Sequence, residues 1–207
     1  MTERRRSFYG WGYEDYQLPA DELAWFERAW SGLFKVDRFE PAAMPRAEEI
    51  TLRAPRVAVP AGLAAVCTTD KHERLFHSFG RSVHDLARMI HRRDFSNPPD
   101  VVAYPKTEQD IAGLLDWCGA NDVAAIPFGG GSSVVGGVNP PAYDRYKGVL
   151  TIDLKHFDRV LEIDRTSQAA RVQGGVLGPS LEEQLKPSGL TLRFFLQAWE
   201  FSSLGGW

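Results

Sequence analysis

The chain has 207 residues, of which 43% are hydrophobic and 12% aromatic, and its formal net charge is −3. This length allows one large domain or two small ones, and the charge gives no electrostatic reason to expect nucleic acid as a partner. Cys67 and Cys118 are too few and too isolated for a disulfide framework or a zinc site, which favours a reducing compartment. No apolar core follows the basic residues 1–6, and no stretch approaches the roughly 20 apolar residues that cross a bilayer, so we expect a soluble, cytoplasmic protein.

Residues 1–96 form the first of two predicted regions, an N-terminal arm followed by helices. The arm at 7–16 (SFYGWGYEDY) is dense in aromatic residues and glycines without periodicity. It either packs on another surface or is a partly ordered terminus. A helix is predicted over 19–33, because apolar residues recur there at helical spacing, and Asp21 is its predicted N-cap.

A second helix is predicted over 82–92, with Ser82 as N-cap. Its buried side is predicted to carry Val83, Leu86, Ala87 and Ile90. Four histidines occur in this part of the sequence: His72, His77, His84 and His91. None forms the i, i+4 helical pair with an acidic neighbour that a zinc enzyme shows, so we expect packed or solvated histidines and no metal site.

The second predicted region, 97–207, begins at a Pro-rich turn (NPPD at 97–100) that marks the domain boundary. A strand at 101–105 is followed by a helix that Thr107 caps and that ends near residue 120. The apolar face of this helix is predicted to carry Ile111, Leu114, Leu115 and Cys118. A second strand then begins at residue 124. This is a β-α-β unit, so its two strands should be parallel, with a right-handed crossover.

Further strands are predicted at 148–154, 160–164 and 169–175, a short helix at 177–186, and an extended segment at 191–199. These elements give an α+β fold class, with a β-α-β first subdomain and the start of a second sheet, preceded by the helical N-terminal region. The chain ends in a second Gly-rich, hydroxyl-bearing segment, FSSLGGW. We therefore expect the second domain to be truncated.

A glycine loop, residues 129–137, leaves the second strand of the β-α-β unit. Its glycines allow positive φ and close approach of a ligand, and successive N–H groups can converge on a phosphate. The loop lacks the Lys of a P-loop, and the glycines and prolines up to residue 141 would break the helix that a dinucleotide-binding fingerprint requires. It predicts an anion site made by backbone amides, with Ser132 and Ser133 at its rim, and a plain surface turn is the alternative.

In order and spacing, the motifs of 97–207 resemble the FAD-binding PCMH-type domain of the vanillyl-alcohol oxidase-type flavoproteins. The motifs are PDVV at 99–102, IPFGGGSSV at 126–134, DL at 153–154, VLEID at 160–164, GG at 174–175 and FSSLGGW at 201–207. Within that group the chain looks most like the alkyldihydroxyacetonephosphate synthases, through EFSSLGGW at 200–207 and YGWGY at 9–13. Ser132 stands where the family usually has Thr. Phe194, Leu196 and Ala198 stand where relatives commonly carry a His, a Pro and a small polar residue.

The resemblance implies a non-covalently bound FAD, because no residue here matches a covalent attachment site. The implied pyrophosphate-binding residues are Pro127, Phe128, Gly129, Gly130, Gly131, Ser132 and Ser133. The residues implied to line the cofactor from the other side are Gln197, Ala198, Trp199, Glu200, Phe201, Ser202 and Ser203. It implies no catalytic residue in this chain, because in such enzymes those residues lie in a later cap domain.

The function implied by the resemblance is ether lipid synthesis, an exchange of acyl for alkyl on dihydroxyacetone phosphate without net redox change of the flavin. The alternatives are a FAD-dependent oxidoreductase acting on a 2-hydroxy acid, and a truncated fragment without activity. The substrate is expected to be a small or lipid-like molecule held by a C-terminal domain absent from these residues. The resemblance leaves open a homodimer and an association of the full-length enzyme with a membrane surface.

Overall fold

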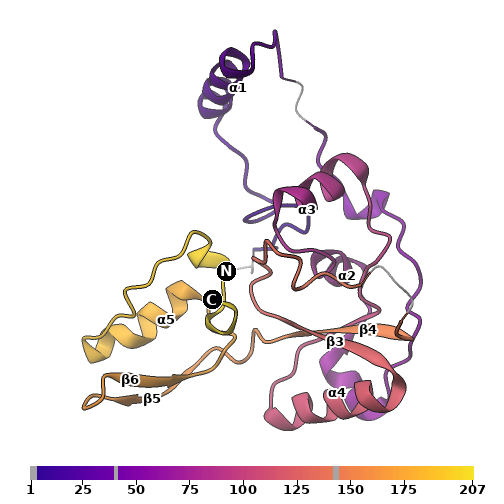
Figure 1. Cartoon of the computed structure of the whole chain (residues 1–207), viewed down its shortest axis with the longest axis vertical. Helices are drawn as coiled ribbons and strands as arrows, with labels where there is room; N and C mark the ends of the chain where they lie inside the picture. The colour runs from indigo at the N-terminus through magenta and orange to yellow at the C-terminus, as the bar shows by residue number, and fades with distance from the viewer. Residues whose placement is uncertain (1–3, 40–41, 142–144) are drawn as a thin grey trace.

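The α+β class predicted from the sequence is confirmed by the structure, a computed structural model that describes residues 4–39, 42–141 and 145–207. A four-stranded sheet and a two-stranded sheet lie beside each other, each with a helix packed on it. A long N-terminal helix projects from the rest of the chain (Figure 1).

The four-stranded sheet has the order β1-β2-β4-β3. β2 (Val101–Ala103) and β3 (Val123–Phe128) both pair in parallel with β4 (Gly148–Asp153), and β1 (Cys67–Thr68) adds an antiparallel edge. The predicted parallel orientation of the two β-α-β strands is therefore confirmed. The two strands are not hydrogen-bonded neighbours, because β4 lies between them.

One face of this sheet is covered by α4 (Glu108–Asn121). Thr107 caps the helix in a capping box with Asp110, as the sequence predicts. Leu115 was predicted for the apolar face but is 49% exposed, and Trp117 packs on the core in its place. Residues 115 and 117 flank the buried pair 114 and 118 on opposite sides of the helix, and the core covers the side of Trp117 but leaves the side of Leu115 exposed. The core on this side of the sheet consists of Val101, Ala103, Leu114, Cys118, Val123, Leu150 and Ile152.

The opposite face is covered by α2 (Lys71–Phe76), whose Phe76 contacts Phe128 of β3. Asp70 caps α2 by accepting from the N–H groups of His72 and Glu73. The helix is also tied to the sheet by His77, which follows it and hydrogen-bonds Asp153.

The helix predicted from residue 82 begins as α3 (Val83–Ala87) and continues as a π-helical turn, η3 (Arg88–Arg92). Ser82 is its N-cap, which confirms that prediction. Val83 is not buried but 83% exposed, because the first turn of α3 faces an open cleft. Met89 is the fully buried apolar residue of this helix instead.

The second sheet is an antiparallel pair, β5 (Val160–Asp164) and β6 (Ala169–Val172), with α5 (Gly178–Leu185) packed on it. Its core consists of Val176, Leu181 and Leu185. The extended segment predicted over 191–199 forms no strand. Residues 191–196, all of which the structure describes, have no regular structure, and Arg193 adopts a left-handed conformation (φ 53°).

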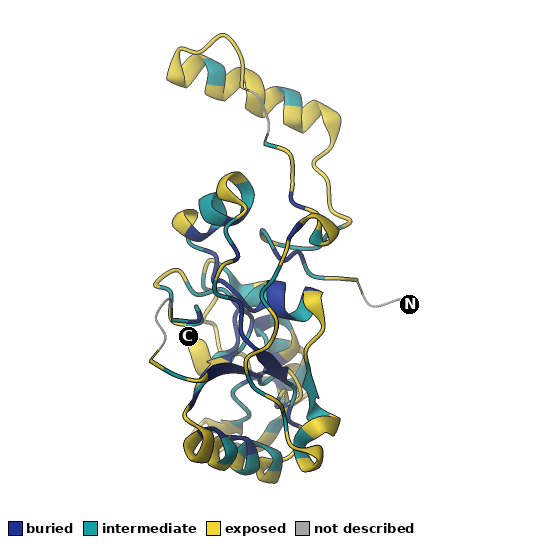
Figure 2. Ribbon diagram, turned by 90° about the vertical axis from the view of Figure 1, so that its right-hand side faces the viewer, coloured by how far each residue is buried: buried dark blue, intermediate teal, exposed yellow. Residues whose placement is uncertain are grey.

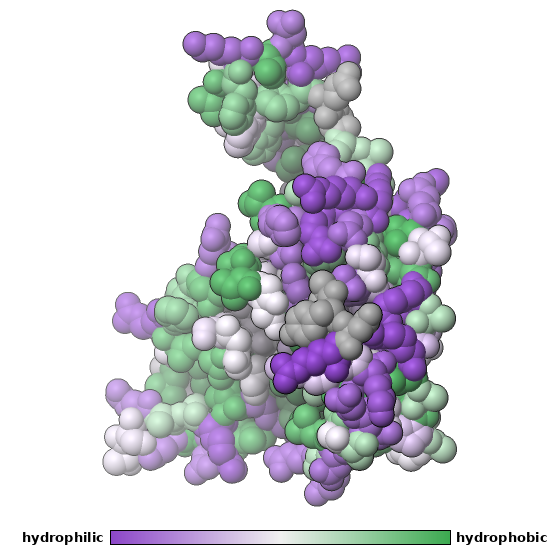
Figure 3. Space-filling view, turned by 45° about the vertical axis from the view of Figure 1, so that its right-hand side comes forward, coloured by the Kyte–Doolittle hydropathy of each residue, from purple (hydrophilic) through white to green (hydrophobic). Residues whose placement is uncertain are grey.

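The predicted N-terminal helix is present as α1 (Ala20–Phe34), but it has no buried residue. It projects from the body of the protein (Figures 1 and 2). Apolar side chains show on its surface (Figure 3). The prediction of Asp21 as N-cap is wrong, because Pro19 holds that position and Asp21 lies in the first helical turn. There a carboxylate still interacts favourably with the helix dipole.

Candidate cofactor site

The glycine loop leaves the carboxyl end of β3 and lies directly against the C-terminal segment. A Cβ on Gly130 would lie 1.5 Å from the carbonyl oxygen of Phe201, and one on Gly129 would lie 1.8 Å from Oγ of Ser203. Gly131 has a φ of +74°, which disfavours any residue with a Cβ. The three consecutive glycines are therefore required by this close packing as well as by any ligand.

The backbone amides of the loop are free to bind a ligand. The N–H groups of residues 130–133 donate no hydrogen bond to the described part of the chain. Gly130 and Gly131 are buried, and unpaired amides at buried positions carry a free-energy cost that a bound acceptor would remove. Successive free N–H groups around a left-handed residue form the concave arrangement that binds phosphate.

The second wall of the site is the segment 197–203, which contains the short helix η5 (Trp199–Phe201). Ser203 bridges to Leu177, and just beyond it the N–H of Leu204 donates to Val176 O. Ser202 Oγ lies 2.7 Å from Ser132 Oγ, so a hydroxyl–hydroxyl hydrogen bond joins the two walls. The C-terminal segment is thereby fixed to both the second sheet and the glycine loop.

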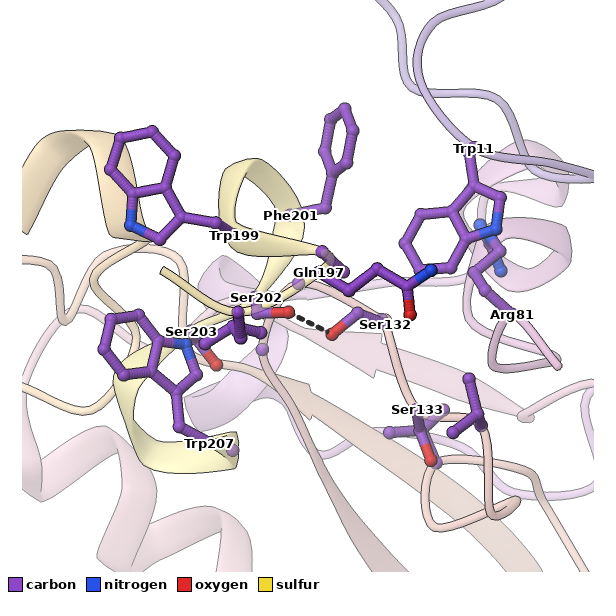
Figure 4. A pocket seen from close by; sticks show the side chains of 18 of the residues that line it. Trp11, Arg81, Ser132, Ser133, Gln197, Trp199, Phe201, Ser202, Ser203 and Trp207 are labelled. Carbon is purple, nitrogen blue, oxygen red and sulfur yellow. Dashed lines mark hydrogen bonds between the residues drawn. The ribbon is translucent and has the colours of Figure 1, made fainter. Parts of the chain in front are cut away.

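Between these walls lies a cleft of about 1240 Å³. This exceeds the roughly 300–1,000 Å³ of ordinary small-molecule pockets, and is large enough for an extended dinucleotide. Trp11 lies at one side of the cleft and Trp199 and Trp207 at the other (Figure 4). The Ser132–Ser202 hydrogen bond lies between them (Figure 4).

Most of the residues that the resemblance implies as cofactor-binding meet at this cleft. Those that line it are Gly129, Gly130, Gly131, Ser132, Ser133, Gln197, Ala198, Trp199, Glu200, Phe201, Ser202 and Ser203. Pro127 and Phe128 belong to β3 and do not line it. Pro127 pairs with Ile152, and Phe128 is 1% exposed and packs on the imidazole of His77, with ring centroids 4.2 Å apart.

The cleft also contains residues that sequence reasoning did not assign to a site, among them Trp11, Arg81 and Trp207. The YGWGY motif around Trp11 and the FSSLGGW motif that ends in Trp207 were signals that could have indicated them. No comparable motif marks Arg81. Its place is set by tertiary structure, through the hydrogen bond from its backbone N–H to Ser133 O (2.7 Å).

Arg6 and Arg81 both hydrogen-bond to the glycine loop, and neither forms an ion pair with a carboxylate among the described residues. Arg81 is 3% exposed, and burial, followed by the like charge of Arg6, lowers its pKa to about 10. Burial also lowers the pKa of Arg6, whose Nε has no hydrogen-bond partner in the described chain. Arg81 remains charged at neutral pH, since its pKa is about 10.

The histidines form no metal site within the described residues, where no group of three His, Cys, Asp or Glu side chains is placed to hold an ion. His77 is fully buried and His72 is nearly so, hydrogen-bonded to Asp153 and Glu14 respectively. His84 and His91 are exposed. Across the described ranges, no helix is both long enough and apolar enough to cross a membrane.

Comparison with known proteins gives consistent relatives. A profile of the FAD binding domain family matches residues 99–207. The alkyldihydroxyacetonephosphate synthase of Dictyostelium discoideum is 36% identical over 138 residues, 67% of this chain and 22% of that protein. Glycolate oxidase subunit GlcD of Bacillus subtilis is 27% identical over 146 residues, 67% of this chain and 30% of that protein. A solved alkyldihydroxyacetonephosphate synthase superposes with a TM-score of 0.79 and 26% identity over 98% of this chain and 42% of its own.

The fold and the cleft define a flavoprotein domain of the PCMH type. The chain belongs to the FAD binding domain family, and its cofactor is FAD. The residues present fit this cofactor, because a glycine-rich loop offers free amides to an anionic group such as a pyrophosphate. The chain spans 22% of the length of the Dictyostelium synthase that it matches.

Proposed function

We propose that this chain is the FAD-binding part of an enzyme of the alkyldihydroxyacetonephosphate synthase type, which exchanges acyl for alkyl on dihydroxyacetone phosphate. One observation carries the proposal. The FAD binding domain match begins at residue 99, but the likeness to the solved synthase extends over 98% of the chain and so includes the helical N-terminal region. The match to the glycolate oxidase subunit covers 67% of the chain, so it leaves part of the N-terminal region unmatched.

In such an enzyme FAD supplies a ring system that reacts with the substrate, and the protein supplies binding and orientation. The amides of 130–133 and the Ser132 and Ser202 hydroxyls would hold the pyrophosphate end of the cofactor, and the segment 197–203 would line its other side. We expect no catalytic residue among those that line the cleft, and we expect the 207-residue chain alone to be inactive.

The proposal is tested in two stages. In the first, the 207-residue chain is titrated with FAD, and binding is measured by the quenching of flavin fluorescence. The matched segment then replaces its counterpart in the Dictyostelium synthase, and the chimera is assayed for exchange of acyl for a long-chain alcohol. A control chimera carries Gly130→Val. Exchange by the first chimera alone would support the proposal. A chimera that holds FAD at a normal ratio but performs no exchange would contradict it.

The second candidate is a FAD-dependent oxidoreductase of 2-hydroxy acids, favoured by the 27% identity to a glycolate oxidase subunit. It is tested by grafting the same segment into that subunit and following oxidation of glycolate with a dye as electron acceptor. Activity in this graft together with none in the synthase chimera would favour the oxidoreductase.

With this function we propose a cytoplasmic enzyme whose lipid-like substrate is held by segments beyond these residues. Contact of the longer enzyme with a membrane surface, or with a second copy, is supported by the exposed aromatic side chains of α1, among them Trp25, Trp30 and Phe34. Flotation of the longer enzyme with phospholipid vesicles and its sedimentation in their absence distinguish the two.

A further inference from the structure

We propose that the N-terminal arm, which in the structure is a hairpin of residues 5–14, is a third wall of the FAD cleft and that Arg81 is the residue that positions it. The inference deepens the cofactor-binding role proposed above and rests on it. It concerns residues that lie entirely before the match to the FAD binding domain at 99–207.

The arm is a folded hairpin and not a loose terminus. Arg6 and Tyr13 form an antiparallel bridge, and the N–H of Ser7 donates to Gly12 O (3.1 Å). Phe8 is 1% exposed and packs in the core formed with Leu75, Phe95 and their neighbours. The arm is therefore anchored at its centre by a buried aromatic side chain.

Arg81 joins this hairpin to the glycine loop. Its guanidinium donates to the carbonyl oxygens of Ser7 (3.0 Å) and Gly10 (2.8 Å) in the arm, and to those of Phe79 and Gly80 beside it. Its backbone N–H donates to Ser133 O at the other end of the residue. A planar guanidinium can bind several carbonyls in fixed directions, which a lysine ammonium cannot reproduce.

The arm also contacts both walls of the cleft directly. Arg6 donates to Gly130 O (3.2 Å) in the glycine loop, and its guanidinium lies 4.3 Å from the ring centroid of Phe201 in the C-terminal wall. The rings of Trp11 and Tyr13 lie 6.3 Å and 6.1 Å from the same phenyl ring. Three side chains of the arm therefore pack around Phe201 of the C-terminal wall.

Two features of the arm region suit a flavin dinucleotide. The indole of Trp11 lines the cleft and is 41% exposed, so it offers a flat apolar face to a ring of the cofactor (Figure 4). The charge of Arg6 lies beside the glycine loop, where its guanidinium donates to Gly130 O, and it favours an anionic pyrophosphate. The ligand of this wall is therefore an aromatic ring joined to a pyrophosphate.

The first test is amide hydrogen exchange of the 207-residue chain with and without FAD. We expect FAD to slow exchange both in residues 129–133 and in residues 5–14. Protection of the glycine loop without protection of the arm would overturn the proposal and leave the cofactor-binding role intact. If neither segment is protected, the cofactor-binding role fails and the proposed wall fails with it.

The second test separates the geometry of Arg81 from its charge. In Arg81→Lys, which keeps the charge, we expect faster exchange of both the arm and the loop without FAD, and about tenfold or greater weakening of FAD binding. The matched control is Arg88→Gln, which alters an arginine paired with Asp94 outside the cleft. If amides of the glycine loop exchange in Arg81→Lys at the same rate as in the parent chain, Arg81 does not position the loop. This result would overturn the proposal whether or not FAD binds.

The third test concerns Trp11. We expect Trp11→Ala to weaken FAD binding severalfold with only a small change in thermal unfolding, because the indole is 41% exposed and lines the cleft. Trp30→Ala on α1 is the control, since that indole is 47% exposed and lies outside the cleft. Equal FAD affinity in the two variants would show that Trp11 does not contribute to FAD binding.

Discussion

At the scale of single residues, Gly130 is a position where both the packing of the two walls and the binding of FAD are expected to require the absence of a side chain. We expect Gly130→Val to lose FAD binding, because its Cβ would lie 1.5 Å from Phe201 O and would push apart the two walls of the cleft. Since the contact is with backbone, no side-chain rotation can relieve it. Flavin retained on purification, measured by absorbance, checks this, and circular dichroism shows whether the sheets remain.

Gly137 provides the matched control in the same loop. A Cβ there would have ordinary contacts, the nearest being Ser133 Oγ at 3.6 Å, so Gly137→Ala should bind FAD nearly as the parent does. Normal flavin content in Gly130→Val would mean that the loop is only a surface turn. Equal loss in both variants would mean that the loop tolerates no substitution for reasons other than this contact.

At the scale of secondary-structure elements, the two N-caps predicted for α1 and α4 can be compared directly. Thr107→Ala should lower the free energy of unfolding by about 1 kcal/mol, because the Thr107 hydroxyl accepts from the N–H of Asp110. Asp21→Ala should cost only a few tenths, since Asp21 lies within the first turn and caps nothing. Urea denaturation of both variants measures the difference, and a larger loss at Asp21 would contradict it.

The elements that could be predicted are those whose signals are local. Thr107 and Ser82 were identified as caps because a hydroxyl residue precedes an apolar-periodic run, and the structure confirms both. The errors arose where distant contacts decide. Val83 has a helical apolar position but faces the cleft, and the place of β4 between β2 and β3 depends on pairing that no local pattern encodes.

The same division applies to the site. The glycine loop and the segment 197–203 carry motifs, and the structure brings both to one cleft. Arg81 carries none, because its role comes from carbonyl oxygens supplied by an arm more than sixty residues earlier, as at Gly10 (sequence separation 71). The domain boundary between residues 96 and 97 stays a prediction.

At the scale of the whole molecule, a charge cluster around the buried carboxylate of Asp100 joins the N-terminal region to the sheet. Asp100 has a fully buried carboxylate that accepts from Arg53, Arg56 and the N–H of Val149. Burial by itself would raise its pKa, but the hydrogen bonds from these partners prevail and lower it below the ordinary value of 3.8.

A carboxyl with a lowered folded-state pKa stabilises the protein above its unfolded-state pKa, and this stabilisation is lost as the pH falls through the folded value. We therefore expect the unfolding temperature to be insensitive to this group above about pH 4 and to fall below it. Asp100→Asn should cost about 1.5–3 kcal/mol at pH 7, because it removes the buried negative charge that accepts hydrogen bonds from Arg53, Arg56 and the N–H of Val149. It should also flatten the acid limb of the stability curve. If the stability of the variant falls at low pH as steeply as that of the parent, other carboxylates cause the fall.

The projecting helix α1 predicts self-association of the 207-residue chain. Its exposed large side chains are Leu23, Trp25, Phe26, Trp30, Leu33 and Phe34. Contiguous apolar surface of this kind associates in water. Sedimentation should detect oligomers that diminish when Trp25, Trp30 and Leu33 are changed together to Gln. A monomeric parent chain would contradict this expectation.

Local stability should also vary along the chain. Residues 100–135 include buried strands and a capped helix, whereas residues 191–195 are exposed and carry no regular structure. We expect fast amide exchange from residue 191 and slow exchange in the β-α-β unit. Uniform protection of both segments would show one cooperative unit.

The place of β4 between β2 and β3 sets an order of assembly during synthesis. As the chain leaves the ribosome, β2 can pair with β1, but β3 has no neighbouring strand until residues 148–153 have emerged. The glycine loop, which follows β3 and packs on residues 201–203, acquires its shape last. The nascent protein therefore carries an unpaired, apolar β3 for some time, which is the stage at which a chaperone would bind it. A ligand of the glycine loop can stabilise the fold only after this step, because the loop has no fixed shape before it.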